Sequence, residues 1–253
     1  MKGIFLGTGT SQGIPVIACE CDVCTSKNVK DNRLRTSFFI QSSTTSIVID
    51  TGPDFRQQML NNKVKKLDAV VFTHEHKDHV AGMDDIRAFN FIQKKDMDVY
   101  ASEQVQFALH REFPYVFAKS KYPGVPMVKL HSIEDDPIQI GDIELIPINV
   151  KHYIMPVKGY RVGPFTYITD AKEIDAKELD KIRGSEILVL NALRKSEHIS
   201  HFNLEEALAL IDEIKPKKAY LTHISHMMGL HDEVSAELPD NVEIAYDGLE
   251  IEF

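Results

Sequence analysis

The sequence predicts an α/β fold in which two mixed β-sheets pack face to face and helices flank them. β-Rich runs occur in both halves of the chain, helical patterns lie between them, and no linker-like or low-complexity segment separates the halves. Histidines and aspartates also follow directly after several of the strand-like runs. These observations indicate a single domain over residues 1–253, with its reactive groups at the carboxyl ends of strands.

The first half of the chain begins with an apolar run, residues 1–6, that leads into the glycine-rich segment 7–13. This segment favours a tight turn with close backbone approach. A phosphate-binding loop is the other interpretation, although no Gly-Lys-Ser/Thr follows. The elements predicted in this half are strands at 1–6, 36–40 and 46–50, a helix at 55–61, a buried strand at 67–72, a helix at 80–93 and a strand starting at Val99.

The second half begins with segment 104–130, which is less regular and rich in aromatic residues and prolines. It fits either a flap over a substrate or a connection packed on the core. Further on, Asn203 and Glu206 form a capping box, and Asp247-Gly248 indicates a hairpin turn. The elements predicted in this half are a hairpin at 138–145 extended by 146–150, a hairpin at 160–169, a strand at 186–190, a helix at 203–214, a strand at 218–222 and a closing hairpin at 242–253.

The segment Thr73–His79 carries three histidines and an aspartate directly after the buried strand. Residues two apart in an extended segment point the same way, so His74 and His76 can bind one metal ion. Asp78 and His79 follow as the chain turns away and can hold a second ion. These donor types suit zinc, manganese or iron(II) rather than calcium. The alternative is a polar turn with incidental histidines.

Three later residues share one position in the predicted fold, because His152, Asp170 and His223 each end a strand-like run. With the earlier motif they make seven donors, which fit two ions. One ion would be held by His74, His76 and His152, the other by Asp78, His79 and His223, with Asp170 as the bridge. Asp50 ends the run 46–50 and either caps a turn or accepts the second N–H of a ligand histidine.

The only cysteines, Cys19, Cys21 and Cys24, lie in the short loop 19–24 with C-x-C-x-x-C spacing. Three thiols can face one zinc ion, and a later histidine can supply the fourth ligand. Free thiols, or a redox pair of Cys21 and Cys24, are the alternatives. Three clustered cysteines cannot form an ordinary disulfide framework, so a reducing, cytoplasmic setting is expected.

The bulk composition, with 43% hydrophobic and 26% charged residues, is that of an ordinary globular protein. The formal net charge of −9 argues against sequence-independent binding to nucleic acid, which requires a basic surface. No apolar run approaches the roughly 20 residues that span a bilayer. We therefore expect a small-molecule substrate and no membrane or nucleic-acid partner.

The H-x-H-x-D-H pattern resembles that of the metallo-β-lactamase superfamily, which implies an αββα sandwich with two divalent catalytic ions, zinc or manganese. The cysteine cluster, His223-Ile224-Ser225-His226 and His201-Phe202-Asn203-Leu204 together resemble the PhnP group, phosphoribosyl cyclic phosphodiesterases of that superfamily. This closer resemblance implies one structural zinc bound by Cys19, Cys21, Cys24 and His226. It also implies that His201 acts as general acid. Homodimers are known in this group, and the sequence leaves a homodimer open.

The donor residues predict a binuclear hydrolase that acts by attack of a hydroxide shared between two cations. The resemblance to the PhnP group implies that its substrates are small cyclic phosphodiesters, of the phosphoribosyl 1,2-cyclic phosphate or cyclic nucleotide type. The residues expected to carry the catalysis are Asp78, Asp170 and His201. The alternatives are an RNA-processing nuclease, a lactone or thioester hydrolase, and a non-enzymatic accessory protein like PqqB. The nuclease interpretation would need a basic surface or an RNA-binding extension.

Overall fold

The computed structural model describes residues 1–253 and contains two seven-stranded sheets that face each other. The first sheet consists of β14 (Glu250–Glu252), β1 (Lys2–Gly7), β2 (Ser37–Gln41), β3 (Ser46–Ile49), β4 (Ala69–Val71), β5 (Met97–Ala101) and β6 (Val128–Ser132), in this spatial order. The second consists of β13 (Val242–Ile244), β12 (Lys218–Thr222), β11 (Ile187–Asn191), β10 (Phe165–Ile168), β9 (Met155–Val162), β8 (Ile143–His152) and β7 (Ile138–Ile140). Each sheet is antiparallel in one part and parallel in the other, so both are mixed as predicted.

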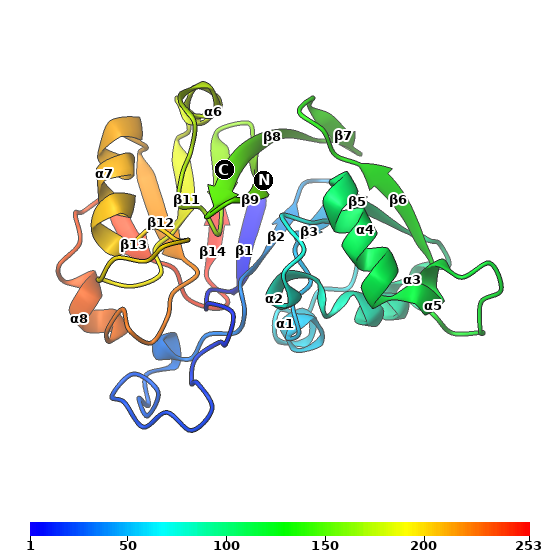
Figure 1. The fold of residues 1–253 in the computed structure, drawn as a ribbon, viewed down its shortest axis with the longest axis horizontal. Helices are drawn as coiled ribbons and strands as arrows, with labels where there is room; N and C mark the ends of the chain where they lie inside the picture. Colours follow the sequence, from blue (N-terminus) through cyan, green and yellow to red (C-terminus); the bar gives the residue numbers. More distant parts are fainter.

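Helices lie on both outer sides of the two sheets (Figure 1). Those beside the first sheet are α1 (Phe55–Asn61), α2 (Lys77–Val80), η2 (Met83–Ile86), α3 (Arg87–Gln93), α4 (Glu103–Glu112) and α5 (Pro114–Phe117). Those beside the second are α6 (Ala176–Ile182), α7 (Leu204–Ile214) and α8 (His231–Ser235). The 3₁₀ turn η1 (Val29–Asp31) contacts the start of α8, where Asp31 accepts from the His231 N–H. None of the helices is both long enough and apolar enough to cross a bilayer.

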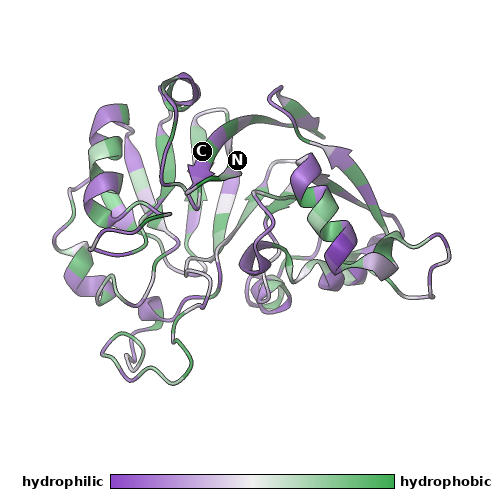
Figure 2. Cartoon of the chain, in the orientation of Figure 1, coloured by the Kyte–Doolittle hydropathy of each residue, from purple (hydrophilic) through white to green (hydrophobic).

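The apolar side chains form three layers, one between the sheets and one under each set of helices. Phe38 of the first sheet stacks on Phe165 and Tyr167 of the second, with ring centroids 5.1 and 5.2 Å apart. Helices α4 and α7 are banded green and purple in Figure 2, as expected of helices with one buried face. Removing a large buried side chain from water stabilises the fold by about 1.5–3 kcal/mol, so these layers hold the sandwich together.

Most predicted elements are confirmed. The three hairpins at 36–50, 138–145 and 160–169 are antiparallel pairs. Helix α7 begins at the predicted capping box, in which Asn203 accepts from the Glu206 backbone and Glu206 accepts from that of Asn203. The glycine-rich segment 7–13 is a close-approach turn, since a Cβ on Gly7 would lie 2.1 Å from the Arg35 carbonyl oxygen.

Two predictions about regular structure are wrong. The closing hairpin at 242–253 does not form, because β13 pairs with β12 in one sheet and β14 pairs with β1 in the other. The single helix at 80–93 is broken near Gly82, where the chain turns to approach Gly52. A Cβ on Gly82 would lie 2.1 Å from the Gly52 carbonyl oxygen, so this contact requires glycine.

Segment 104–130 is more regular than predicted and includes α4, α5 and β6. Val105, Leu109, Phe113 and Val116 are buried in the layer beneath the helices. Of the two interpretations of this segment, the structure therefore favours the connection packed on the core.

Candidate metal centre

The predicted donors meet where strands of both sheets end. His74, His76, Asp78 and His79 follow β4, while the second sheet contributes His152 at the end of β8, Asp170 after β10 and His223 after β12. His201 joins them from the loop between β11 and α7. The carboxyl ends of strands meet along one edge of a sheet, which explains how residues so far apart in the chain converge.

The group formed by Asp78, His79 and His223 is compact. Nε2 of His79 lies 3.2 Å from an Asp78 oxygen and 3.2 Å from an Asp170 oxygen. Nε2 of His223 lies 3.1 Å from the other Asp170 oxygen and 3.8 Å from Asp78. Both imidazoles therefore direct the same ring nitrogen toward the two carboxylates.

The other histidines gather beside this group. The ring centroids of His74 and His76 are 4.8 Å apart, those of His76 and His152 5.1 Å, and those of His74 and His152 6.0 Å. Asp170 has an oxygen within 4.8 Å of ring nitrogens of His74 and His79, and also within that distance of His152 and His201. Its central position fits the predicted bridging role.

The second ring nitrogen has a fixed partner in three of the donor imidazoles, those of His74, His79 and His152. His79 donates from Nδ1 to Asp50 at 2.7 Å, and His152 donates from Nδ1 to the Ser200 carbonyl at 2.8 Å. Nδ1 of His74 lies 2.9 Å from the Thr73 hydroxyl, which itself donates to Asp50 at 2.8 Å. These bonds fix the tautomer, so Nε2 of each ring can bind a metal. Thr73 and Ser200 were not predicted, whereas Asp50 accepts a ligand histidine's N–H as one interpretation proposed.

The backbone at the centre is strained. Asp50, Asp170 and His223 adopt φ values of 64°, 56° and 57°, in the left-handed region that side chains with a Cβ rarely occupy. Such conformations cost about 1–3 kcal/mol each and persist only where the surrounding structure enforces them. The Gly9–Ile224 bridge, which places the glycine-rich turn beside His223, contributes to that enforcement.

The electrostatics of the centre depend on burial and on close opposite charges. Burial lowers the pKa of His74 well below its usual value. Burial alone would raise the pKa of Asp170, but His223 and His79 hold it well below its usual range. Likewise burial opposes a charge on His79, yet Asp78 and Asp170 raise its pKa. For His201, burial and the neighbouring His223 lower the pKa to about 2, so its imidazole is neutral near pH 7.

These donors fit a pair of divalent cations. Nε2 of His74, His79 and His223 and Nδ1 of His201 are buried without a hydrogen-bond partner. Buried polar atoms are nearly always satisfied, and leaving several unpaired in one place is costly unless they bind an ion. Imidazole nitrogens and carboxylate oxygens in this number suit zinc or manganese.

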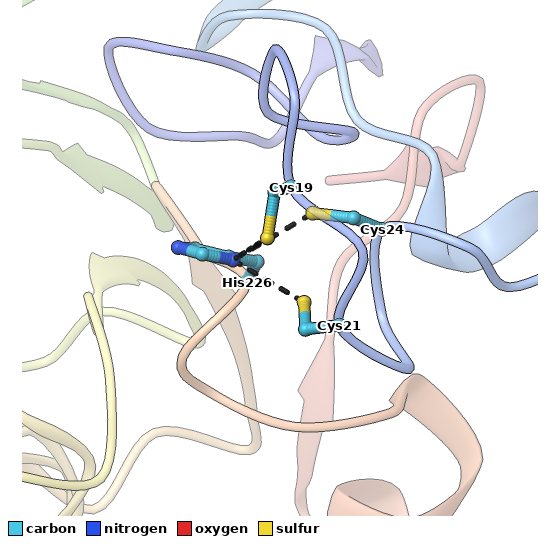
Figure 3. Close-up of side chains that lie close together, drawn as sticks. All are labelled: Cys19, Cys21, Cys24 and His226. Atoms are coloured by element: carbon cyan, nitrogen blue, oxygen red, sulfur yellow. Dashed lines mark hydrogen bonds between the residues drawn. The ribbon is translucent and has the colours of Figure 1, made fainter.

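A second cluster lies on the loop 19–24 (Figure 3). Nδ1 of His226 is 3.3, 3.4 and 3.6 Å from the sulfur atoms of Cys19, Cys21 and Cys24. The backbone N–H of Cys24 and the His226 ring lower the pKa of Cys21 to about 6, while burial raises that of Cys24 to about 11. Four soft donors around one point fit a closed zinc site better than a pair of redox thiols.

The two clusters share one short segment, because His223 belongs to the first and His226 to the second. Between them, Ile224 donates its N–H to the Thr8 carbonyl at 2.8 Å and accepts from the Thr10 N–H at 3.0 Å. The segment is therefore fixed on the turn that follows β1.

A comparison with known families defines the class of protein. A family model described as the β-lactamase superfamily domain matches residues 45–224, a range that includes all seven histidine and aspartate donors. The chain belongs to this superfamily.

Within the superfamily, the chain has a close structural relative in the PhnP family. The crystal structure of a diphosphatase of that family superposes with a TM-score of 0.93 and is 37% identical, covering 100% of this chain and 97% of the other. The predicted relationship to the PhnP group is thereby confirmed.

Two further relatives carry other names. An octanoyltransferase of Porphyromonas gingivalis is 40% identical over 253 residues, which are 99% of this chain and 51% of that protein. The chain thus spans about half the length of this relative. An exodeoxyribonuclease, WalJ, of Streptococcus pneumoniae is 23% identical over 248 residues, covering 86% of this chain and 87% of that protein.

Proposed function

We propose that this protein is a metal-dependent phosphodiesterase that hydrolyses small cyclic phosphodiesters at the histidine–aspartate centre. The observation that carries the proposal is the convergence of buried, unpartnered ring nitrogens on Asp170. Two relatives bear names that denote hydrolysis at phosphorus, the PhnP-family diphosphatase and the exodeoxyribonuclease. The net charge of −9 favours a small substrate over a nucleic acid.

The chain's own residues have separate tasks in this proposal. His74, His76 and His152 would hold one cation, Asp78, His79 and His223 the other, and Asp170 would contact both. When bound, such a pair of cations lowers the pKa of water between them and neutralises charge on a phosphate. Asp50 keeps His79 in the required tautomer through its bond to Nδ1.

His201 is placed to assist departure of the leaving group. Its ring lies 4.4 Å from that of His152 and 4.8 Å from that of His223, and its Nδ1 lies 3.6 Å from Asp170. The one N–H of the neutral imidazole can donate a hydrogen bond to the departing oxygen. To act as general acid, His201 must first take up a proton, such as the one released from the attacking water, and pass it to the departing oxygen. Proton donation of this kind contributes about 10²–10⁴-fold.

Metal analysis combined with a substrate panel tests the proposal. The protein, loaded with zinc or manganese, is assayed with bis-p-nitrophenyl phosphate, 2′,3′-cyclic nucleotides, a lactone and an octanoyl thioester. We expect two catalytic ions per chain besides the thiol-bound zinc, and turnover of the phosphodiesters. Full metal occupancy without phosphodiester turnover would contradict the proposal.

Acyl-thioester hydrolysis is the second candidate, and one observation favours it. About half of the octanoyltransferase relative matches this chain. A sequence related to this chain is therefore part of a polypeptide that is named for acyl transfer. A buried centre that activates water can attack a carbonyl carbon as well as phosphorus. Preferential turnover of the octanoyl thioester would select this candidate.

A further inference from the structure

The metal centre is open to solvent on one side. His76 is exposed and His152 is half-buried, whereas His74, His79, Asp170 and His223 are buried. The open side of the centre therefore lies beside His76 and the end of β8, and the residues that follow His152 border it. Those residues are Tyr153 and Ile154, the two-residue loop between β8 and β9.

Tyr153 and Ile154 are unusual residues for such a loop. Two-residue hairpin loops favour Asn, Asp or Gly wherever φ is positive, and Tyr153 has φ of 57°. Both side chains are exposed, Tyr153 by 56% and Ile154 by 83%, so burial does not account for them. A residue choice that breaks a local rule without gaining packing is expected at functional positions.

A third exposed apolar side chain lies close to this loop. Ile199 is 68% exposed and precedes Ser200, whose carbonyl accepts the 2.8 Å hydrogen bond from His152. Tyr153 and Ile199 thus adjoin the two residues joined by that bond. We define Tyr153, Ile154 and Ile199 as the apolar rim.

The cationic side chains near the donors have partners of their own. Every lysine or arginine within six residues of a catalytic donor or of His201 is paired with an acid, and the lysines concerned are Lys77, Lys151, Lys158, Lys172, Lys195, Lys217 and Lys218. Arg194, seven residues before His201, donates to the carbonyls of Ser196 and Glu197. A second phosphate on the substrate would therefore meet no unpaired cation among these residues.

We propose that the apolar rim binds a flat, uncharged ring on the substrate, so that the preferred ester is a nucleoside cyclic phosphate without further phosphate groups. This inference rests on the proposed function and selects between its two substrate types. An aromatic side chain stacks on the face of any base, at about 1–3 kcal/mol per base. The base-free phosphoribosyl ester offers no such face and adds a second anion.

The test compares three esters: 2′,3′-cyclic AMP, ribose 1,2-cyclic phosphate and 5-phosphoribosyl 1,2-cyclic phosphate. We expect the metal-loaded protein to have its highest kcat/KM with 2′,3′-cyclic AMP, called cyclic AMP below. In Tyr153→Gly the ratio of kcat/KM for cyclic AMP to that for ribose 1,2-cyclic phosphate should fall about tenfold or more. Tyr153→Phe keeps the ring and should keep the ratio, as should the matched control Tyr122→Gly, which alters an exposed tyrosine in the loop between α5 and β6.

Tyr153→Gly also separates binding from folding. Glycine adopts positive φ without strain, so this variant should keep or raise the Tm while losing the ratio. A preference for the phosphoribosyl ester, or an unchanged ratio in Tyr153→Gly, would overturn the inference.

If the metal-loaded protein hydrolyses none of the esters, the proposed function fails and the inference is decided by binding. Calorimetry then compares AMP with ribose 5-phosphate. Tighter binding of AMP that disappears in Tyr153→Gly would support the apolar rim as a base site. Equal affinities for the two ligands would reject it.

Discussion

The histidine–aspartate centre and the thiol cluster are held in place in different ways. In the first, Asp50, Thr73 and Ser200 orient three of the imidazoles through hydrogen bonds to Nδ1, and most donors are buried at strand ends. In the second, the three thiols lie on a loop without helix or strand, and Cys21 is exposed. The fold thus arranges the first set of donors in advance, whereas the second depends more on its own ligation.

This difference predicts different consequences of metal loss. Emptying the histidine–aspartate centre should remove activity and leave the sandwich intact, since strands and hydrogen bonds hold the donors. Emptying the thiol cluster should destabilise the loop 19–24, because a metal ion that binds only the folded loop stabilises that loop. The four predictions below test this contrast, from the largest expected effect to the smallest.

The largest effect is expected from Asp170→Ala. Asp170 is the carboxylate predicted to contact both catalytic ions. Its removal should lower turnover by about 10³-fold or more and reduce the catalytic metal content, while the thiol-bound zinc stays. Plasma emission spectrometry of the purified variant measures both metals, with Asp180→Ala as the exposed control. Full catalytic occupancy in Asp170→Ala would mean that the bridging assignment is wrong.

A smaller and substrate-dependent effect is expected from His201→Ala. Both catalytic ions should remain, and esters with poor leaving groups should slow by about 10²-fold or more, because these need a proton donor. p-Nitrophenyl esters, whose leaving group needs no proton, should slow much less. If both ester types slowed equally, His201 would not be the acid.

Cys21→Ser tests the thiol cluster itself. We expect loss of one zinc per chain, a fall in Tm of several degrees and faster proteolysis within the loop 19–24, with the two catalytic ions retained. Turnover should fall by no more than about tenfold, through the segment shared with His223. Asp22→Ala, which removes an exposed carboxylate from the same loop, is the control for a general loop effect. Unchanged zinc content in Cys21→Ser would argue against the four-ligand site.

The smallest effect is expected in the stability of the protein at low pH, through His231 beside the segment that carries the thiol cluster. Arg33 donates to Nδ1 of buried His231 at 3.1 Å, and the His231 backbone N–H donates to Asp31 at 2.7 Å. Burial and the positive charges of Arg33 and Lys30 lower the pKa of His231 to about 4, against the smaller opposing influence of Asp232 and Asp31.

A histidine with a depressed pKa stabilises the fold above its unfolded pKa near 6.5, and this contribution is lost as the pH falls toward about 4. The free energy of unfolding should therefore drop by about 1–3 kcal/mol across that window. His231→Gln does not titrate and should lack this part of the pH dependence. Urea unfolding of both proteins between pH 7 and pH 4 measures the difference, and parallel curves would contradict the assignment.

Much of the site could be predicted because its donors obey local rules. The spacing of His74 and His76 requires only that residues two apart share a side of an extended chain. His152, Asp170 and His223 were identified because each ends a strand, and the carboxyl ends of strands in a sandwich meet. The fold class followed from the same strand pattern and is confirmed.

What escaped prediction depends on contacts between distant parts of the chain. The Ser200 carbonyl that orients His152 has no signature in the sequence, because every residue carries a carbonyl. Asp247-Gly248 indicates a turn, but the strands on either side of it belong to different sheets. The break near Gly82 arises from its approach to Gly52. His226 was identified only through the resemblance to the PhnP group.

The three-residue interval between His223 and His226 has a practical consequence for handling the protein. A chelating agent that strips a zinc ion from Cys19, Cys21, Cys24 and His226 would also remove one constraint from the segment that carries His223, a donor of the other site. In preparations purified with such agents, zinc should therefore be restored to the thiol cluster before metal is titrated into the histidine–aspartate centre.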